Sequence, residues 1–331
     1  MKKLRIVIFV LFAVLCVLAF PFGGEMYTAA AETERVYIGG FPIGITMDVG
    51  GLLIESVNGV ETEYGVAYVD GLNKGDIIIK VKNERVKSVA EMQDLLTDEP
   101  VNIELIRDGE AVSVEVKPII EAYTKKPRLG VKIKEKIYGI GTVTFIRQNG
   151  TYAALGHEIY DADTDTHLPS ASGVINACKI LGVKQGKKGE AGAIMASIMA
   201  DRIYGTITCN NKFGIAGTYT HETDTGEKGE LTAVASRDDV HAGAAQIRTT
   251  VDGTPTYFDI EIIKASKQTG KKEKGIVFRV TDKRLLELTG GVVRGMSGSP
   301  IVQDGKLVGA VTHVFLNDFT KGYGVYADCL N

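Results

Sequence analysis

A serine stands between glycines near the C-terminal end of the chain, in the segment 295–300, GMSGSP. Glycines let the backbone turn tightly, so that a serine hydroxyl projects and backbone N–H groups converge on a developing oxyanion. The segment therefore predicts a nucleophile at Ser297, with the N–H groups of Gly295 and Ser297 as the oxyanion hole. A merely structural turn is the weaker alternative.

A serine nucleophile needs a base, and the chain contains five histidines. His157 ends the small-residue run 151–157, TYAALGH, which resembles the histidine entry of trypsin-like enzymes. We predict that His157 is the base. We expect His313 to be a supporting or core histidine, and we expect solvated positions in polar loops for the other three, His167, His221 and His241.

A carboxylate is needed to fix the tautomer of the histidine and to stabilise its charge. Asp282 ends an expected strand shortly before Ser297 and is the first candidate. Asp161, Asp163 and Asp165 remain alternatives. Their alternation also resembles a calcium loop, but the glycine and the later glutamate of such a loop are missing, so we expect a solvated loop, no metal and no cofactor.

The composition indicates the elements that must position these residues. The chain has 331 residues, which favours two domains, and its 39 glycines, few aromatic residues and lack of tryptophan are typical of short strands joined by turns. The formal net charge is −3, which disfavours nucleic acid as a partner. We therefore expect a mainly β protein that does not bind nucleic acid.

The first residues resemble an export signal. Residues 1–5 are basic, residues 6–22 form an uncharged apolar run, and three alanines precede Glu32. An apolar run of this length is also close to the shortest that spans a membrane. Residues 1–31 are therefore predicted to be a signal peptide or a membrane anchor, and the chain is expected to be exported.

Residues 35–120 predict a small β domain with one main helix. The helix is expected from Ser88 to Leu96, with Ser88 as N-cap, Glu91 as its capping-box partner, and an apolar face. That face comprises Val89, Met92, Leu95 and Leu96.

Two segments of this domain, 71–78 (GLNKGDII) and 82–86 (KNERV), resemble the strand-turn-strand core of PDZ domains. Upstream, 39–45 (GGFPIGI) resembles the loop that holds a peptide carboxylate in those domains. A peptide would then add as a strand beside residues 43–47. The alternative is a rigid spacer without a ligand. The predicted peptide-binding residues are Gly40, Phe41, Pro42, Ile43, Gly44 and Ile45.

A polar, basic stretch at 121–128 suits a linker, and residues 129–331 again alternate short apolar runs with turns. We expect a second β-rich domain that forms a trypsin-like double β-barrel. Cys178, Cys209 and Cys329 show no metal-site spacing, so buried free thiols are expected.

Four stretches together resemble the SpoIVB family of sporulation peptidases: 154–157, 281–282, 288–300 and 309–315. The resemblance implies a PDZ-containing serine peptidase that is exported to the space between the two forespore membranes. It implies cleavage of itself and of a membrane regulator of an intramembrane metalloprotease, which then processes pro-sigma-K. The catalytic residues of the family fall on His157, Asp282 and Ser297.

Two residues depart from the pattern of that family. Phe319 stands where a proline is expected, and Cys329 stands where an aromatic residue is usual. Two other functions remain open. A broad extracytoplasmic quality-control protease also joins the two domain types, although its PDZ domain commonly follows the protease. A catalytically inactive PDZ scaffold is the second alternative.

Overall fold

The computed structural model describes residues 33–168, 172–187, 189–220 and 228–330. Over these residues the protein is mainly β, as predicted, with two α-helices. No helix in the described ranges is both long and apolar enough to cross a membrane. The predicted signal or anchor, residues 1–31, and His221 lie outside the described residues.

The first β structure of the C-terminal region is a run of six neighbouring strands, called the ring, in which the first and last strands also pair with each other. Strands β11, β12, β17, β16, β15 and β2 are neighbours in that order, and the additional pairing of β2 with β11 joins the ends of the run. Large apolar side chains such as Phe41 and Tyr152 form its core. The strands are β2 (Pro42–Val57), β11 (Val131–Arg147), β12 (Thr151–Ala154), β15 (Gly173–Lys184), β16 (Ala193–Asn211) and β17 (Gly214–Tyr219).

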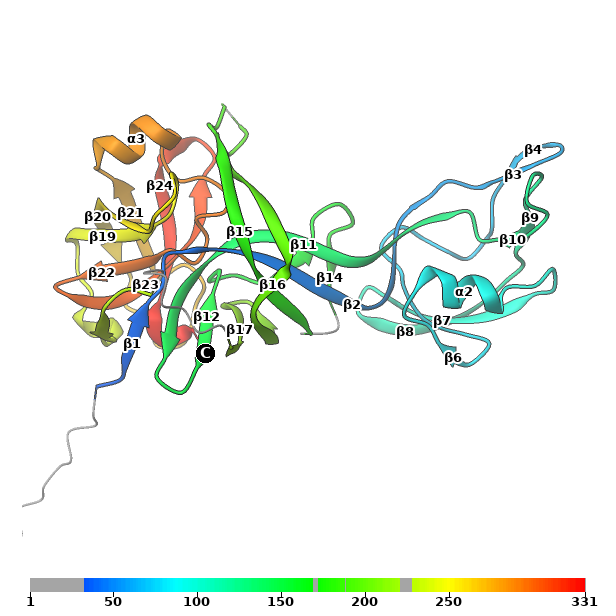
Figure 1. Cartoon of the computed structure of the whole chain (residues 1–331), viewed down its shortest axis with the longest axis horizontal. Helices are drawn as coiled ribbons and strands as arrows, with labels where there is room; N and C mark the ends of the chain where they lie inside the picture. The colour runs from blue at the N-terminus through cyan, green and yellow to red at the C-terminus, as the bar shows by residue number, and fades with distance from the viewer. Residues whose placement is uncertain (1–32, 169–171, 188, 221–227, 331) are drawn as a thin grey trace, which may run out of the picture. The chain divides into compact units, whose positions relative to one another are not determined.

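The second β structure is a closed barrel of six strands with its own apolar core, which includes Phe278 and Ile301. The predicted barrel in the C-terminal region is thus confirmed. Helix α3 (Lys283–Thr289) follows the third strand of the barrel (Figure 1). The strands are β19 (Gly243–Thr249), β20 (Thr256–Ala265), β21 (Ile276–Val280), β22 (Pro300–Gln303), β23 (Lys306–Phe315) and β24 (Asp318–Tyr326).

Short elements complete the C-terminal region. Strand β1 pairs with β11 on one side and with β18 on the other. The remaining elements are β1 (Arg35–Ile38), β13 (Tyr160–Asp161), β14 (Thr166–His167), β18 (Leu231–Ala233), η1 (Arg237–Asp239) and η2 (Ala327–Cys329).

A third core belongs to a smaller unit, which we call the N-terminal β-domain, residues 51–133. Its sheet packs on helix α2, and Leu52, Ile103 and Leu129 are buried in its core. The elements are α2 (Val89–Leu95), β3 (Val60–Thr62), β4 (Gly65–Ala67), β5 (Ile77–Val81), β6 (Glu84–Arg85), β7 (Val101–Arg107), β8 (Glu110–Val116), β9 (Ile119–Ile120) and β10 (Pro127–Arg128).

The predicted start of helix α2 agrees with the structure. The Ser88 hydroxyl accepts a hydrogen bond from the Glu91 N–H at 3.2 Å, which satisfies one of the free donors of the first turn. The Glu91 carboxylate accepts from Lys87 N–H. Met92 and Leu96 are buried, whereas Val89 is 37% exposed, so Val89 is not part of the buried face.

The domain boundary predicted near residues 121–128 does not match the packing. β1 and the first half of β2 precede the predicted linker in sequence, but they pack with the strands of the C-terminal region. Phe41 and Ile43 are buried in the core of the ring. Leu129, beyond the predicted linker, is buried instead in the N-terminal β-domain. The reason is that β2 and β11 are long strands that pair along most of their length and serve both cores (Figure 1).

The residues of the predicted peptide-binding loop, Gly40, Phe41, Pro42, Ile43, Gly44 and Ile45, do not form an open loop in the structure, because they lie just before strand β2 and in its first residues. Residues 43–47 pair with β15 on one edge and with β11 on the other, so no edge is open to an added strand. The N–H groups of Gly39 and Gly40 already donate to backbone oxygens of β11. A Cβ on Gly39 would stand 2.1 Å from the Val143 carbonyl oxygen, so glycine is needed here for close packing of two strands.

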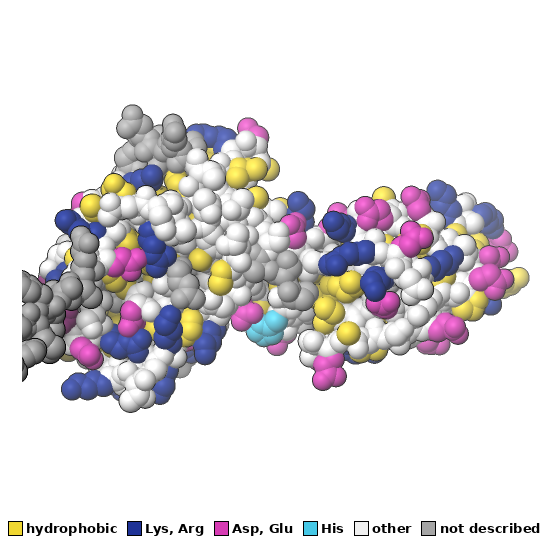
Figure 2. All heavy atoms as spheres, turned by 90° about the horizontal axis from the view of Figure 1, so that it is seen from below, with side chains coloured by type: hydrophobic (Ala, Val, Ile, Leu, Met, Phe, Trp, Pro, Cys, Tyr) yellow, Lys and Arg dark blue, Asp and Glu magenta, His cyan; other side chains and the backbone are white. Residues whose placement is uncertain are grey.

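Charge is spread over the molecular surface. On the face in Figure 2, basic and acidic side chains are interspersed, and the histidine in view lies beside acidic groups. Of the three cysteines of the described chain, Cys329 is buried, whereas Cys178 and Cys209 are partly exposed.

Candidate active site

The turn that carries Ser297 depends on two glycines with positive φ. Gly295 has φ +98° and Gly298 has φ +94°, a region that other residues rarely adopt. A Cβ on Gly298 would also lie 2.0 Å from the Thr142 carbonyl oxygen and 2.5 Å from Leu155 N. The nucleophile turn is therefore pressed against the strand pair β11–β12.

Strand β11 holds the turn by donating hydrogen bonds to carbonyl oxygens of the turn. The Thr142 hydroxyl donates to Gly295 O at 2.8 Å, and Thr142 N–H donates to Ser297 O at 2.9 Å. The Thr144 hydroxyl donates to Gly298 O at 2.7 Å. These bonds fix the orientation of three peptide groups around the serine.

The N–H groups of Gly295 and Ser297 are the predicted oxyanion hole. Neither donates a hydrogen bond to any residue that the structure describes. Two fixed N–H donors without an internal acceptor are what binding of a developing negative charge requires.

His157 follows a turn with unusual backbone geometry. Leu155 has φ +71° and Gly156 has φ +74°, which turns the chain sharply after β12. His157 Nδ1 lies 2.9 Å from the carbonyl oxygen of Glu158. A carbonyl only accepts, so Nδ1 carries the proton and Nε2 keeps the lone pair that a base needs. Burial lowers the pKa of His157, which favours the neutral imidazole.

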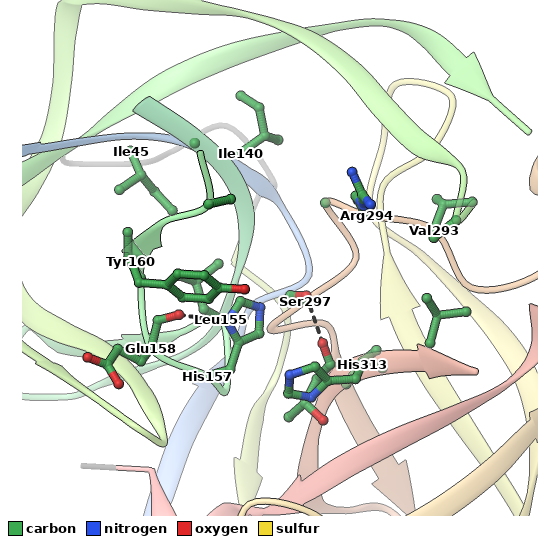
Figure 3. A pocket seen from close by; sticks show the side chains of 18 of the residues that line it. Ile45, Ile140, Leu155, His157, Glu158, Tyr160, Val293, Arg294, Ser297 and His313 are labelled. Atoms are coloured by element: carbon green, nitrogen blue, oxygen red, sulfur yellow. Dashed lines mark hydrogen bonds between the residues drawn. The ribbon is translucent and has the colours of Figure 1, made fainter. Parts of the chain in front are cut away.

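Ser297 and His157 line the same cavity, which has a volume of about 690 Å³ (Figure 3). Most of the lining is apolar, with Arg294 as the cationic residue among the side chains in the close-up. In this structure the Ser297 hydroxyl donates to Thr312 O at 2.9 Å. A rotation about the Cα–Cβ bond of Ser297 is therefore needed before the hydroxyl donates to His157.

His313 lies beside His157 in the cavity, with ring centroids 5.1 Å apart and an angle of 39° between the rings. Partial burial, together with repulsion from His157 and Lys274, lowers the pKa of His313. Because its side chain remains exposed to solvent, this effect is weaker than complete burial would produce. A neutral second imidazole thus stands next to the base.

The structure places Asp282, the first candidate for the carboxylate that orients His157, at the start of helix α3. It caps helix α3: its carboxylate accepts from Arg284 N–H at 2.9 Å and forms an ion pair with the Arg284 guanidinium at 2.6 Å. It also accepts from Asp259 N–H. The hydrogen bond and charge of Arg284 lower the pKa of Asp282 to about 2. Its acceptor sites are occupied by the start of a helix, and it does not line the cavity.

The alternative carboxylates are engaged elsewhere. The Lys134 ammonium bonds Asp161 at 2.8 Å and Asp163 at 2.5 Å, and Asp161 also accepts from Thr164. Asp165 adopts a positive φ in the turn between β13 and β14. Among the described residues, no group of His, Cys, Asp or Glu side chains is arranged to hold a metal ion.

Two of the histidines expected in polar loops are exposed. His167 Nδ1 lies 2.9 Å from the Glu158 carboxylate and is 69% exposed, and His241 pairs with Asp304. The Glu158 carboxylate raises the pKa of His167. Glu158 thus contacts two histidines, His157 through its carbonyl and His167 through its side chain.

Sequence patterns did not point to several parts of this site. The carbonyl of Glu158 is a backbone group that any residue offers, so its role has no sequence signal. Thr142 and Thr144 occupy alternate positions of a strand, a common arrangement for β-branched residues. Asp282 is different, because an Asp before an apolar run that ends in glycine is a helix-capping signal in its own right.

A known protein family matches the part of the chain that carries this site. The model of the SpoIVB peptidase S55 family matches residues 125–330, which is more than half of the chain and includes His157, Ser297 and every other residue that lines the cavity except Ile45. No curated protein matches the chain. On the strength of the family match, this chain belongs to the SpoIVB peptidase S55 family.

Proposed function

We propose that this chain is a serine endopeptidase that hydrolyses peptide bonds through an acyl-enzyme. Ser297 Oγ attacks the carbonyl carbon while its proton passes to His157 Nε2. The N–H groups of Gly295 and Ser297 bind the oxyanion. His157 then gives the proton to the leaving amine as the C–N bond breaks, and water releases the acyl group by the same steps.

One observation carries this proposal: a serine and a neutral histidine share an apolar cavity in which two backbone N–H groups lack an acceptor. An inactive scaffold has no need for either the free donors or the fixed tautomer. Membership of a peptidase family supports the same reaction class.

The test uses a fluorophosphonate probe on the full-length chain, with mass spectrometry of the adduct and of any cleavage products. Wild type is expected to be labelled on Ser297, whereas Ser297→Ala is expected to show neither adduct nor self-cleavage. Ser299→Ala is the matched control, since Ser299 lies in the same turn but is buried, with its hydroxyl bonded to Thr249 at 2.9 Å. A folded wild type without an adduct would favour the scaffold function.

The sporulation role follows as the finer part of the proposal. Residues 1–31 would bring the chain through or to a membrane, into the space between the forespore membranes. There it would cleave itself, which calls for contact between copies, and a membrane regulator of an intramembrane metalloprotease. Co-expression with those two proteins and pro-sigma-K tests this: processing should require Ser297, and processing by the Ser297→Ala variant would contradict it.

A peptide ligand is also proposed for the N-terminal β-domain as a PDZ-like module, at a different place from the 40–45 loop. A groove of about 470 Å³ lies between α2 and the start of β11, with Met92 on one side and residues 129–133 on the other. β11 pairs there with β2 along one edge only, as in the pair Val131 and Val57. An extended peptide can therefore add along the second edge.

Lys134 provides a route from this groove to the catalytic histidine. It directly follows the strand segment that lines the groove, and its ammonium holds Asp161 and Asp163 in the hairpin that begins just after His157. Thr166 of the same hairpin contacts Gly75 O of the N-terminal β-domain at 3.4 Å.

A peptide that binds the groove is expected to change the labelling rate of wild type but not that of Lys134→Met. Lys80→Met serves as the control, because Lys80 also forms an ion pair, with Glu104, in the N-terminal β-domain but does not line the groove. Equal responses of wild type and both variants would exclude Lys134 from the coupling.

A further inference from the structure

Asn210, near the end of β16, binds both polar backbone groups of Ile159. Asn210 Oδ1 accepts from Ile159 N–H at 2.9 Å, and Asn210 Nδ2 donates to Ile159 O at 2.9 Å. Only one orientation of the side-chain amide satisfies both bonds, because one partner is a donor and the other an acceptor. The amide therefore clamps one residue of a loop from a strand that is distant in sequence.

The N–H that Asn210 binds belongs to the peptide group that orients the base. Glu158 O and Ile159 N–H are the two polar ends of one peptide plane, and in a trans peptide they point in opposite directions. Glu158 O accepts from His157 Nδ1 at 2.9 Å, while Ile159 N–H donates to Asn210. A planar group held at one end presents a fixed acceptor at the other.

Two of these bonds, Ile159 N–H to Asn210 Oδ1 and His157 Nδ1 to Glu158 O, therefore form a continuous series from the Asn210 carbonyl, through the peptide, to the imidazole. Successive hydrogen bonds of this kind polarise one another, so the Asn210 carbonyl makes Glu158 O a better acceptor. Asp282, which caps helix α3, does not contribute to this series.

The side chain of Glu158 is held more weakly than its backbone carbonyl. Its carboxylate bonds His167, whose side chain is 69% exposed, so solvent competes for that contact. Besides Glu158, the other polar or titratable side chains that line the cavity with His157 are Ser297 and Arg294 on the turn, Thr312 and His313 on β23, Tyr138 on β11 and Tyr160 on β13. None of them accepts from Nδ1 in the structure.

We infer that Asn210 is a positioning residue for His157: through the Glu158–Ile159 peptide it fixes the imidazole orientation and tautomer, the task that a carboxylate performs in other serine peptidases. This inference rests on the proposed function, because it gives Asn210 a role only if His157 is the base of Ser297. It adds a residue that no pattern in the sequence had indicated.

The test compares Asn210→Ala with Asn211→Ala in the full-length chain. Asn211 is the next residue of the same strand, but its side chain bonds Cys209 and Phe213 in place of Ile159. The measurement is the second-order rate of fluorophosphonate labelling of Ser297 as a function of pH, with circular dichroism to follow folding.

Asn210→Ala is expected to slow labelling about 10- to 100-fold, since small misplacements of a catalytic group have effects of this size. In this variant the acid limb of the pH profile, where the labelling rate falls, is expected to move to lower pH. The bond to Glu158 O raises the pKa of His157, so a weaker bond leaves the imidazole neutral at more acidic pH. A purely structural defect would lower the labelled fraction without moving this limb. Asn211→Ala is expected to behave as wild type.

Two outcomes separate this inference from the proposed function. If wild type itself is not labelled, the serine peptidase mechanism fails. If wild type is labelled and a folded Asn210→Ala matches it in rate and pH profile, only the role of Asn210 is overturned.

If Asn210→Ala does not fold, the isosteric Asn210→Asp replaces it. That variant keeps an acceptor for Ile159 N–H and loses the donor to Ile159 O, so a smaller rate loss is expected. A folded Asn210→Asp that labels at the wild-type rate, or failure of both variants to fold, would also overturn the role of Asn210 as a positioning residue.

Discussion

Two segments of this protein, 295–298 and 39–45, both combine glycines with a predicted functional role, but the structure places their backbone N–H groups in different surroundings. In the segment 295–298, the N–H groups of Gly295 and Ser297 lie beside a cavity and have no acceptor among the residues that the structure describes. The segment 39–45 has its N–H groups taken up by neighbouring strands and its large side chains buried in a core.

The difference shows what a glycine pattern indicates. Glycine permits a positive φ or the close approach of another group, but a glycine in the sequence does not identify that group. At Gly39 the approaching group is the backbone of β11 itself, whereas at Gly295 it is the Ile194 side chain, and Gly295 also lines the cavity. Substitutions in the two segments should therefore affect different properties.

The largest effect is expected at Gly295. Alanine there would disfavour φ +98° and turn the N–H away from the oxyanion, so kcat/KM should fall about 10²- to 10³-fold. The added Cβ would meet only the Ile194 side chain at 3.0 Å, so the fold should persist. Peptide hydrolysis and thermal unfolding measure the two properties.

Gly305→Ala is the matched control for that variant. Gly305 also has a positive φ, +71°, but it lies in the turn between β22 and β23 with no atom near an added Cβ. Equal activity losses in the two variants would show that general backbone strain, and not the oxyanion hole, is responsible.

Gly39→Ala should instead lower stability. The Cβ would stand 2.1 Å from the Val143 carbonyl oxygen, and the strands must separate to admit it, at a cost of about 2–3 kcal/mol. Urea unfolding is the measurement, with Gly270→Ala as a control in open space. Activity per folded molecule should stay near that of wild type, and a specific loss of activity would place the 39–45 segment back among the functional sites.

A smaller effect is expected for Asp282→Asn. Asparagine is a good N-cap but loses the ion pair with Arg284, so stability should fall by about 1 kcal/mol or less while labelling of Ser297 continues. If Asp282 were the triad carboxylate, the same change would reduce the rate about 10⁴-fold. The labelling rate therefore distinguishes the two roles directly.

The smallest effect concerns pH. Because burial lowers the pKa of His157 below 6.5, the imidazole is already neutral at pH 7, and labelling should change less than about twofold between pH 7 and pH 8. The rate should fall only as the pH drops through that lowered pKa. A midpoint above pH 6.5 would show that a carboxylate reaches His157 in solution.

Local patterns in the sequence predicted much of the framework. The mainly β content, the C-terminal barrel and the Ser88 cap of α2 followed from composition, alternation and capping residues. Local patterns also contained the information on Asp282, since Asp282 and Gly290 bracket helix α3 as N-cap and C-cap. Proximity of Asp282 to Ser297 along the chain does not make the two residues neighbours in space.

Long-range pairing could not be predicted in this way. Residues 42–48 and 136–142 form one antiparallel pair, and this pairing decides that the 39–45 segment belongs to a core. The register of such a pair depends on the contacts of both faces along two strands, which no single segment contains.

The amino-acid sequence by itself determined which residues can do chemistry here: a serine on a glycine turn and a histidine after a small-residue strand, together with the family to which they belong. Only the tertiary structure decided which groups orient them. The Glu158 carbonyl bonds His157, and the Asn210 amide bonds Ile159 of the same peptide group, because β16 lies beside the loop that follows β12. Hydrogen bonds act over about 3 Å, so their partners are set by the packing of distant segments and not by order along the chain.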